Sequence, residues 1–392
     1  MAGAAPGAPS GNAGSSEVLI SALREVGVVT LLSHKIAAIP HWRTTAEDVI
    51  ELGTQPFVIH GEALGAGFVQ RRRLRTWTCG WAVNSRYAGA LMTSRLPYAI
   101  WEATLTGDEL SSVTISEGRK NGRGSGLGAA LHSMFLPIGT GLEGLLYRKA
   151  TILCAMSEHT RSRMIEVHGL DPDRVLLLPH PPSPLFLDAL NRARPNVPTR
   201  NVLTSESLKL LFVGRVDDPR KGASDMLAAI AHARAARLPV ELTVVGPYSE
   251  RWRQRFTSLL EAAGASLRGR VDLDELALAY LSHDALILPS RQEGFGIVVA
   301  EAFHAGLPVI ATRSGGPEHT ISQSGGGLLV DREPASLAAS FQILLENVAL
   351  RRSMAANAAR YASGVLSIPA FFGRVRDLTQ ILIESARPLT PN

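Results

Sequence analysis

The sequence predicts an α/β protein built from two Rossmann-like, doubly wound domains that face each other across a cleft. Short apolar segments alternate with helical ones along the chain, which is the pattern of parallel sheets with helices on both faces. A proline-rich stretch near the middle, residues 179–206, separates two such series. The 392 residues are enough for two domains, and ligands of such folds lie at the carboxyl ends of the strands.

The first series predicts an N-terminal domain over residues 17–185. Its expected strands are residues 28–33, 56–60, 75–79, 98–101, 151–156 and 175–178. Uninterrupted apolar runs of this kind are typical of strands that are buried on both faces. Residues 1–16 are rich in glycine, proline and serine, and form either a tail or the remnant of a glycine loop.

The second series predicts a C-terminal domain over residues 207–366, after a linker at residues 186–206. Its expected strands are residues 208–213, 241–245, 266–268, 285–288, 308–311 and 327–330. Helices are expected between them at residues 223–236, 249–263, 274–281 and 297–305. This alternation is the unit from which a doubly wound sheet is assembled.

Positive charge is concentrated in the N-terminal half. The formal net charge is +5, and residues 70–124 contain nine Lys or Arg against four Asp or Glu, with clusters at 71–75 and 119–123. These clusters are either solvated surface, a contact for anionic lipid headgroups, or a site for a phosphorylated acceptor. Nucleic acid is not expected as a partner, because few aromatic residues lie among the basic ones.

Composition also indicates the compartment. No run approaches 18 uninterrupted apolar residues, and the N-terminus lacks the basic and apolar regions of a secretory signal. Cys79 and Cys154 are the two cysteines, and their apolar surroundings predict buried small residues rather than a disulfide framework. We therefore expect a cytoplasmic protein, with peripheral contact at the inner face of the membrane if the basic clusters bind lipid.

The most informative motif is PSRQEGFGIVVAE, residues 289–301, directly after an expected strand. Glu293 and Glu301 lie eight residues apart around a Gly-Phe-Gly at the start of a helix. A rise of ~1.5 Å per residue separates them by ~12 Å, too far for the paired carboxylates of a glycoside hydrolase. The two glutamates are either solvated, or they contact the two ends of an extended ligand whose phosphates meet the helix N-terminus.

Two further motifs follow expected strands. In GRVDDPRKG, residues 214–222, Arg215 and Lys221 can converge on a diphosphate, because a turn after a parallel strand points into the cleft. The alternative is a surface turn with incidental cations. Gly315 and Gly316 form a turn that either brings backbone donors near a phosphate or makes a tight corner.

Together these motifs resemble the donor domain of the retaining, nucleotide-sugar-dependent glycosyltransferases of family 4, which have the two-domain GT-B architecture. The matching order is GRVDDPRKG, DLDEL, HDALILPS, EGFGIVVAE and AGLPVIATRSGG. The resemblance covers about residues 206–346 and extends more weakly through 143–181. Residues 367–392 resemble the helix that crosses back to the N-terminal domain, followed by a tail.

The resemblance implies donor-binding roles for four charged residues, of which Arg215, Lys221 and Glu293 would also be catalytic. Arg215 and Lys221 would hold the donor pyrophosphate, Glu301 would accept hydrogen bonds from the ribose, and Glu293 would contact the sugar. Fixed cations and helix N-termini stabilise the departing diphosphate, so neither a metal nor a cofactor is expected.

The resemblance also assigns backbone roles in donor binding. Gly294, Phe295 and Gly296 would orient the sugar through their backbone. Arg270 and Val271 match the place where the base stacks against backbone in this family.

The N-terminal half departs from the family pattern. Gly11 and Gly14 match a loop that meets the donor phosphates, but no strand precedes them here, so they form either that loop or a tail. Where many relatives carry a cleft histidine, this chain has Trp101 and Glu102. Glu102 either orients an acceptor hydroxyl or pairs with an arginine. His60, at the end of an expected strand, is either a catalytic candidate or a structural residue.

The family resemblance implies a retaining hexosyltransferase of carbohydrate biosynthesis. It would move a hexose from a nucleotide diphosphate sugar to a glycan, a glycolipid or a small metabolite. The alternative is a catalytically impaired homologue that binds a nucleotide sugar or a partner transferase without transfer. The departures in the N-terminal half motivate this alternative, whereas the complete set of expected donor residues argues against it.

Overall fold

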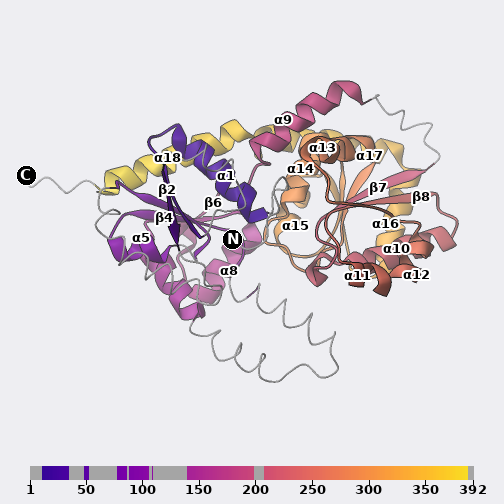
Figure 1. The fold of residues 1–392 in the computed structure, drawn as a ribbon, viewed down its shortest axis with the longest axis horizontal. Coiled ribbons are helices and arrows are strands. Elements are labelled where there is room, and N and C mark those ends of the chain that lie inside the picture. The colour runs from indigo at the N-terminus through magenta and orange to yellow at the C-terminus, as the bar shows by residue number, and fades with distance from the viewer. Residues whose placement is uncertain are drawn as a thin grey trace, which may run out of the picture. The chain divides into compact units, whose positions relative to one another are not determined.

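The chain forms two compact units, shown in the computed structural model of Figure 1. The structure describes residues 11–34, 48–52, 77–85, 88–105, 108, 139–197 and 207–386. Unit 1 consists of Met1–His180 together with Ile368–Asn392, and unit 2 consists of Pro181–Ser367. Both are α/β units with parallel sheets, which confirms the predicted fold class.

Unit 2 contains a six-stranded parallel sheet. Its strands are β7 (Leu208–Val213), β8 (Val240–Val245), β9 (Ser266–Gly269), β10 (Ala285–Leu288), β11 (Val309–Thr312) and β12 (Gly327–Val330). Their spatial order is β12-β11-β10-β7-β8-β9, and all neighbouring strands are parallel. Chain order therefore reverses between β7 and β10, as in a Rossmann fold.

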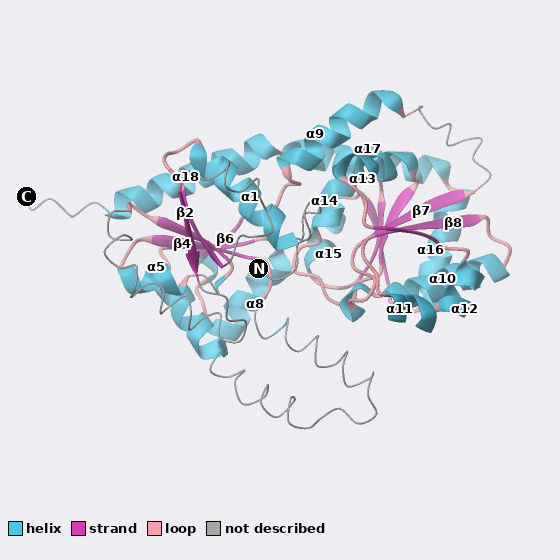
Figure 2. Cartoon of the chain, in the orientation of Figure 1, coloured by secondary structure: helices cyan, strands magenta, loops and turns pink. Residues whose placement is uncertain are grey.

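Helices cover both faces of the unit 2 sheet (Figure 2). They are α9 (Pro184–Ala193), α10 (Ala223–Ala235), α11 (Glu250–Arg255), α12 (Thr257–Ala263), α13 (Leu273–Ser282), α14 (Ile297–Ala305), α15 (Gly316–Ser324), α16 (Pro334–Glu346) and α17 (Val348–Gly364). On one face, α10 packs against α12 and α16 around the fully buried Phe212, Ile230 and Phe341. Each such side chain stabilises the fold by roughly 1.5–3 kcal/mol. On the other face, α13 packs against α9 and α14 against α17.

Unit 1 has a four-stranded parallel sheet and a separate parallel pair in its described part. The sheet has the order β3 (Gly80–Val83), β4 (Tyr98–Glu102), β5 (Ile152–Ala155) and β6 (Val175–Leu177), and the pair is β1 (Thr30–His34) and β2 (Asp48–Leu52). Its helices include α1 (Gly11–Arg24), α5 (Gly89–Ser94), α8 (Glu158–His168) and α18 (Ile368–Ala386). Residues 139–149 are also helical. The strands β4 and β5 are buried along their whole length, as their apolar composition predicts.

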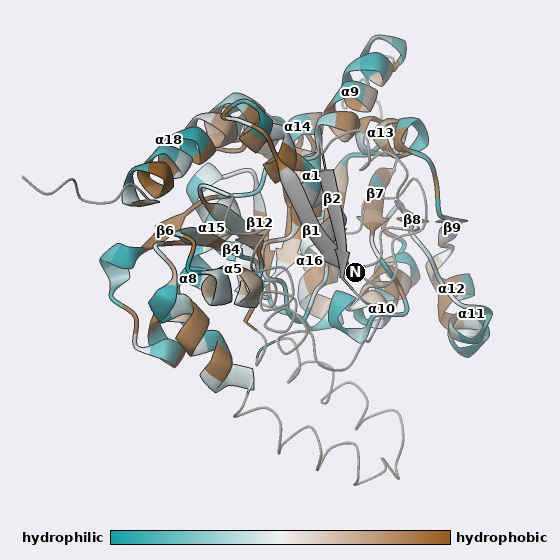
Figure 3. Cartoon of the chain, turned by 60° about the vertical axis from the view of Figure 1, so that its left-hand side comes forward, coloured by the Kyte–Doolittle hydropathy of each residue, from teal (hydrophilic) through white to brown (hydrophobic). Residues whose placement is uncertain are grey.

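Helix α18 belongs to unit 1, although unit 2 separates it in sequence from the rest of that unit. Its buried residues are Phe371, Val375, Thr379 and Leu382, spaced three or four apart so that they form one face. Figure 3 shows apolar and polar residues alternating along it. The Trp81 indole N–H donates to the Thr379 hydroxyl at 3.1 Å, and α18 also packs against α1.

Three predicted elements differ from the structure. The segment 186–206, predicted as a linker, begins inside α9, because Pro184 occupies the first turn of a helix, where proline is tolerated, and Phe186 and Leu190 are buried. The helix expected at 249–263 is divided at Phe256 into α11 and α12. The strand expected at 75–79 is instead β3, whose pairing with β4 starts at Gly80.

Three further predictions concern the two cysteines, the strand at residues 56–60 and membrane-spanning helices. Cys154 is buried as predicted, whereas Cys79 is only half-buried; burial raises the pKa of both thiols, that of Cys154 to about 12. The strand expected at 56–60 lies outside the described residues. None of the helices in the described part combines the length and the apolar character that crossing a membrane requires.

Candidate functional site

Two of the sequence motifs meet where the strand order of unit 2 reverses. Strands β7 and β10 are hydrogen-bonded neighbours in the sheet. The segment 214–222 follows β7, and the segment 289–296 follows β10. The two loops therefore share the carboxyl edge of the sheet at its switch point, which is where doubly wound folds bind their ligands.

Lys221, Glu293 and Ser290 form the centre of this site. The Lys221 Nζ lies 2.5 Å from the Glu293 Oε1, although the residues are 72 positions apart in the chain. The Ser290 hydroxyl donates to the same oxygen at 2.8 Å. Glu293 is 8% exposed, and the Lys221 side chain 25%. The structure thus brings together two residues that the sequence predicted for one ligand. The sequence motif did not lead us to predict a role for Ser290, although it lies only three residues before Glu293 in the same turn.

Asp218 organises the loop that carries the cations. Its carboxylate accepts from the Arg220 backbone N–H at 3.0 Å and from the Arg220 Nη2 at 2.7 Å. Burial raises the pKa of Asp218, but the hydrogen bonds and charge of Arg220 outweigh this, so the pKa is lowered. The Arg215 Nη2 lies 3.6 Å from the same carboxylate, and its side chain is 65% exposed. Arg215 is therefore accessible to a ligand, while the Lys221 amine contacts Glu293.

The glycine pair after β11 is a tight corner. The Gly316 N–H donates to the Glu293 carbonyl at 2.9 Å, and the Gly315 N–H donates to the Glu318 carboxylate at 2.9 Å. A Cβ at Gly316 would lie 2.2 Å from the Gly294 carbonyl oxygen. Of the two predicted roles, the geometry favours the corner, because both N–H groups are used within the chain. This corner supports the backbone on either side of Glu293.

Glu301 is held inside unit 2 by one hydrogen bond. It is 6% exposed, and the Tyr280 hydroxyl donates to its Oε2 at 2.6 Å. Burial raises the pKa of Glu301 to about 7, although the bond from Tyr280 favours the ionised form. Tyr280 is itself buried and packs edge-to-face on Phe186, with 5.4 Å between ring centroids. Sequence reasoning missed Tyr280, because on α13 it is one apolar position among several.

The other predicted donor residues lie in loops at the same edge of the sheet. Gly296 precedes the first residue of α14 with φ 83°, a conformation that favours glycine, and the neighbouring Phe295 is buried. Gly294 lies in the same turn. Arg270 and Val271 follow β9, and Arg270 is exposed. All five therefore occupy the carboxyl side of the sheet; Gly294, Phe295 and Gly296 lie beside the positive end of the α14 dipole, whereas Arg270 and Val271 follow the edge strand β9.

Glu102 lies in an enclosed polar cluster of unit 1. It is fully buried at the end of β4, where its Oε2 accepts from the Ser85 N–H at 2.8 Å and from the Tyr147 hydroxyl at 2.9 Å. The Ser85 hydroxyl also donates to Glu143 at 3.2 Å, and the other oxygen of Glu143 lies 3.2 Å from the His168 Nε2. Burial, and then the charge of Glu143, raise the pKa of Glu102 to about 7. Of the two predicted alternatives for Glu102, the pairing with an arginine is not found among the described residues, where its partners are a serine and a tyrosine.

Of the remaining sequence candidates, the structure describes Trp101, Gly11 and Gly14. Trp101 is fully buried, and its indole N–H donates to the Leu178 carbonyl at 2.8 Å. Gly11 and Gly14 lie within α1 rather than in a loop; the chain has no proline between residues 11 and 24 to interrupt that helix. His60 lies outside the described residues. The basic clusters at 71–75 and 119–123 lie outside them too, so the membrane contact stays a prediction.

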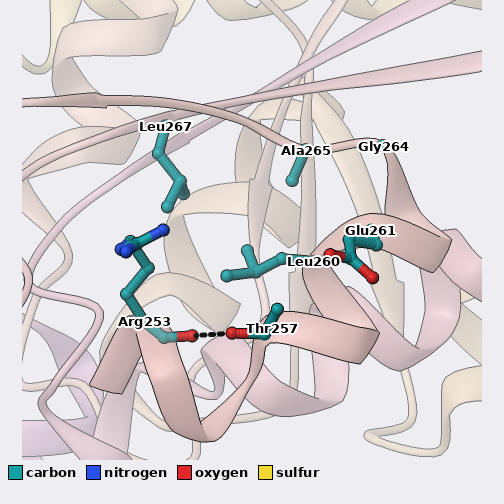
Figure 4. A pocket seen from close by; sticks show the side chains of 7 residues that line it. All are labelled: Arg253, Thr257, Leu260, Glu261, Gly264, Ala265 and Leu267. Atoms are coloured by element: carbon teal, nitrogen blue, oxygen red, sulfur yellow. Dashed lines mark hydrogen bonds between the residues drawn. The ribbon is translucent and has the colours of Figure 1, made fainter. Parts of the chain in front are cut away.

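A separate hollow of about 300 Å³ lies between α11, α12 and the start of β9 (Figure 4). It is lined by Arg253, Thr257, Leu260, Glu261, Gly264, Ala265 and Leu267. The start of a parallel strand is at the amino edge of the sheet, so this hollow does not belong to the candidate site. Within the described ranges, no three His, Cys, Asp or Glu side chains are grouped as metal ligands. Metal-independent chemistry stays a prediction.

Comparison with known proteins identifies the domain that contains this site. Residues 194–361 match the family described as Glycosyl transferases group 1. The D-inositol 3-phosphate glycosyltransferase of Paenarthrobacter aurescens is 30% identical over 220 residues, which are 54% of this chain and 53% of that protein. The protein of the same name from an Arthrobacter species is 36% identical over 162 residues, 40% of this chain and 38% of its own. The chain thus spans about half the length, or less, of these curated relatives.

Solved structures show the same overall fold at lower identity. Sucrose-phosphate synthase from Thermosynechococcus elongatus matches with a TM-score of 0.73 at 20% identity, covering 98% of this chain and 96% of that one. Anabaena HepE in complex with UDP-glucose matches with a TM-score of 0.67 at 16% identity, covering 96% and 98%. These likenesses support the two-domain GT-B fold, and the family match supports a glycosyltransferase group 1 domain in unit 2.

Proposed function

We propose that this protein, with its group 1 glycosyltransferase domain, transfers a hexose from a nucleotide diphosphate sugar to an acceptor hydroxyl, with the anomeric configuration retained. The observation that carries this proposal is the Lys221–Glu293 pair at the switch point of the unit 2 sheet. A cation and a carboxylate side by side suit a ligand in which phosphates adjoin sugar hydroxyls. A solved protein of similar fold is named as a complex with such a ligand, UDP-glucose.

Each charged residue has a role in this reaction. The bond between the anomeric carbon and the diphosphate oxygen breaks, and its electron pair leaves with the diphosphate. Arg215 and Lys221 stabilise the charge that develops there. The acceptor oxygen attacks from the same face, and its proton passes to the leaving phosphate oxygen. Glu293 holds sugar hydroxyls and Glu301 holds the ribose, so no protein nucleophile and no metal are required.

The acceptor is proposed from the relatives and from the charge of the chain. The curated relatives are named for D-inositol 3-phosphate, and residues 70–124 carry an excess of basic residues. A phosphorylated acceptor would be attracted to such a segment. D-inositol 3-phosphate is therefore the first acceptor to test, followed by unphosphorylated inositol as the matched control.

A donor screen followed by turnover tests the proposal. Uridine, guanosine, adenosine and thymidine diphosphate sugars are compared by thermal shift, because a ligand of the native state raises the midpoint. Release of the nucleoside diphosphate is then measured for the wild type, Lys221→Ala and Glu301→Ala. We expect a loss of about 100-fold or more for Lys221→Ala, the effect of removing a group that stabilises developing charge.

Arg253→Ala is the matched control, since this arginine pairs with Glu250 on the exposed helix α11 and lines the separate hollow of Figure 4. Its turnover should stay within about twofold of the wild type, the range of surface substitutions. Unchanged turnover in both Lys221→Ala and Glu301→Ala would remove the donor-site assignment. Binding of a nucleotide sugar without release, across a broad acceptor panel, would instead favour the catalytically impaired homologue.

A further inference from the structure

Arg291, in the loop after β10, forms a bidentate ion pair with Asp225, in the first turn of α10. The Arg291 Nη2 lies 2.8 Å and 3.0 Å from the two carboxylate oxygens of Asp225, and its Nε lies 3.2 Å from Oδ2. The side chains are 33% and 25% exposed, and the residues are 66 positions apart in the chain. Planar two-point pairing of this kind fixes direction as well as distance. Neither residue belongs to the predicted donor site.

Two further contacts join the loop 214–222, which leads into α10, to the loop 289–296. The Arg291 N–H donates to the Arg220 carbonyl at 2.6 Å. Gly222 has φ 64°, and a Cβ there would lie 1.9 Å from the Pro289 carbonyl oxygen, so the backbones are in direct contact. Arg220 directly precedes Lys221, and Arg291 precedes Glu293 by two residues. The contacts therefore lie immediately beside the two functional groups.

The Lys221–Glu293 pair cannot hold the loops together throughout a reaction cycle. A bound nucleotide sugar offers phosphates to Lys221 and hydroxyls to Glu293, so it competes with the contact that these residues make in the free protein. The Arg291–Asp225 pair makes no contact with either functional group in the structure, and a donor leaves it in place. It is the charged contact suited to keep the two loops in register with the ligand bound.

We propose that Arg291 and Asp225 are positioning residues, which fix the separation of Lys221 and Glu293 while a donor occupies both. This inference rests on the proposed function. Displacing one functional group by about 1 Å can lower a rate about 100-fold, because the leaving group and the sugar must be held at once. Binding of a nucleoside diphosphate alone does not need Glu293, so it should be much less sensitive to the pair.

A double-mutant cycle tests the proposal. Arg291→Ala, Asp225→Ala and the double variant are assayed with UDP-glucose, or with the donor that the screen identifies, and binding of the matching nucleoside diphosphate is titrated. Each single variant should lower kcat by about 10-fold to 100-fold, while the Kd of the nucleoside diphosphate changes less than about threefold. The double variant should be no slower than the slower single variant, because one interaction is lost in all three.

Two controls separate positioning from general damage. Arg291→Lys keeps the charge but loses the planar fork, so its kcat should lie between those of the wild type and Arg291→Ala. Arg253→Ala removes an equally bidentate pair of the same unit, with distances of 2.6 Å and 2.9 Å to Glu250, and should leave kcat unchanged. An unchanged kcat in Arg291→Ala, losses that multiply in the double variant, or a nucleoside diphosphate Kd that rises in step with the loss of kcat would overturn the proposal.

Amide exchange in the ligand-free protein gives a readout that needs no donor. Loss of the pair should speed exchange at least about tenfold in both segments 218–222 and 289–293, because each opens when the other is released. If exchange becomes faster in neither segment, or only in the segment next to the substitution, the pair does not hold the two loops together and the proposal is overturned. If the wild type neither binds nor cleaves any donor, the proposed function fails, whereas the exchange result still decides whether the pair joins the loops.

Discussion

The two units place carboxylates at the ends of parallel strands in opposite electrostatic surroundings. In unit 2, Glu293 follows β10 and pairs with the partly exposed Lys221. In unit 1, Glu102 ends β4 and lies near a second buried carboxylate, Glu143, with neutral donors from Ser85 and Tyr147. A pair of opposite charges near the surface can exchange partners with a charged ligand. Two buried like charges are instead relieved by taking up a proton. On this comparison we propose ligand chemistry for unit 2 and a supporting role for Glu102.

The largest expected effect is a difference in turnover between two conservative substitutions. Glu293→Gln removes the charge beside Lys221 and replaces one of the two acceptor oxygens offered to sugar hydroxyls by an amide donor, so kcat/KM for the donor should fall about 100-fold or more. Glu102→Gln keeps the shape of a buried side chain and should change kcat/KM by less than about threefold. Steady-state kinetics of donor cleavage measure both. A loss in Glu102→Gln as large as that in Glu293→Gln would make Glu102 catalytic, as the sequence pattern allowed.

The second effect concerns two glycines with the same backbone conformation. Gly222 in unit 2 and Gly169 in unit 1 have φ of 64° and 59°, but an added Cβ meets the Pro289 carbonyl oxygen at 1.9 Å only at Gly222. At Gly169 nothing lies within 4 Å. Gly169→Ala should therefore cost about 1 kcal/mol of unfolding free energy, the cost of the left-handed conformation alone. Gly222→Ala should cost more than about 3 kcal/mol, because the backbones must also separate. Equal costs in denaturant unfolding would show that the two loops are not in contact.

The third effect is a pH dependence of stability from Glu102. Its pKa is about 7 in the folded protein, against 4.5 for an ordinary glutamate, with burial as the main cause and Glu143 as the second. Because the pKa of Glu102 is raised in the folded protein, its contribution to the unfolding free energy is fully present below pH 4.5. This contribution is lost as the pH rises through about 7. Glu301 contributes in the same direction, since burial raises its pKa to about 7 as well.

Urea unfolding of the wild type and of Glu102→Gln between pH 5 and 8 measures this dependence. The substitution should reduce the fall in unfolding free energy across this range, and Glu301→Gln should do so independently, because the two residues lie in different units. The exposed Glu261→Gln serves as the control and should reproduce the wild-type slope. A steeper fall in Glu102→Gln than in the wild type would contradict a protonated Glu102.

The smallest expected effect compares two tyrosine hydroxyls. Tyr280 donates to Glu301 at 2.6 Å and Tyr147 donates to Glu102 at 2.9 Å, and both tyrosines are buried. Either Phe substitution should cost about 1–2 kcal/mol of unfolding free energy. Only Tyr280→Phe should also weaken binding of a nucleoside diphosphate, by a few-fold, because Glu301 is the residue proposed to hold the ribose. A matching loss of affinity in Tyr147→Phe would remove this distinction between the units.

Local sequence patterns were sufficient for the strands and loops of unit 2. The segment 285–288 was predicted as β10 with the observed bounds, and the motifs that follow β7 and β10 lie at the predicted edge of the sheet. These features depend on apolar runs and turn residues within about ten positions of one another. The family resemblance added which side chains of each loop would contact a donor.

Contacts between distant residues could not be predicted in the same way. The pairing of Lys221 with Glu293, and of Arg291 with Asp225, depends on the strand order that makes β7 and β10 neighbours. No local pattern encodes that order. Proline misled the prediction at Pro184, because the same residue marks a linker or starts a helix according to what packs behind it.

Hydrogen exchange with and without bound nucleoside diphosphate tests most directly whether the ligand site lies in unit 2. The nucleotide of the donor that the screen identifies is added at saturation, and peptide-level exchange is compared across the chain. We predict protection of residues 214–222 and 289–301, with residues 98–105 of unit 1 unchanged. Protection confined to residues 98–105, with the two loops of unit 2 unaffected at saturation, would contradict it.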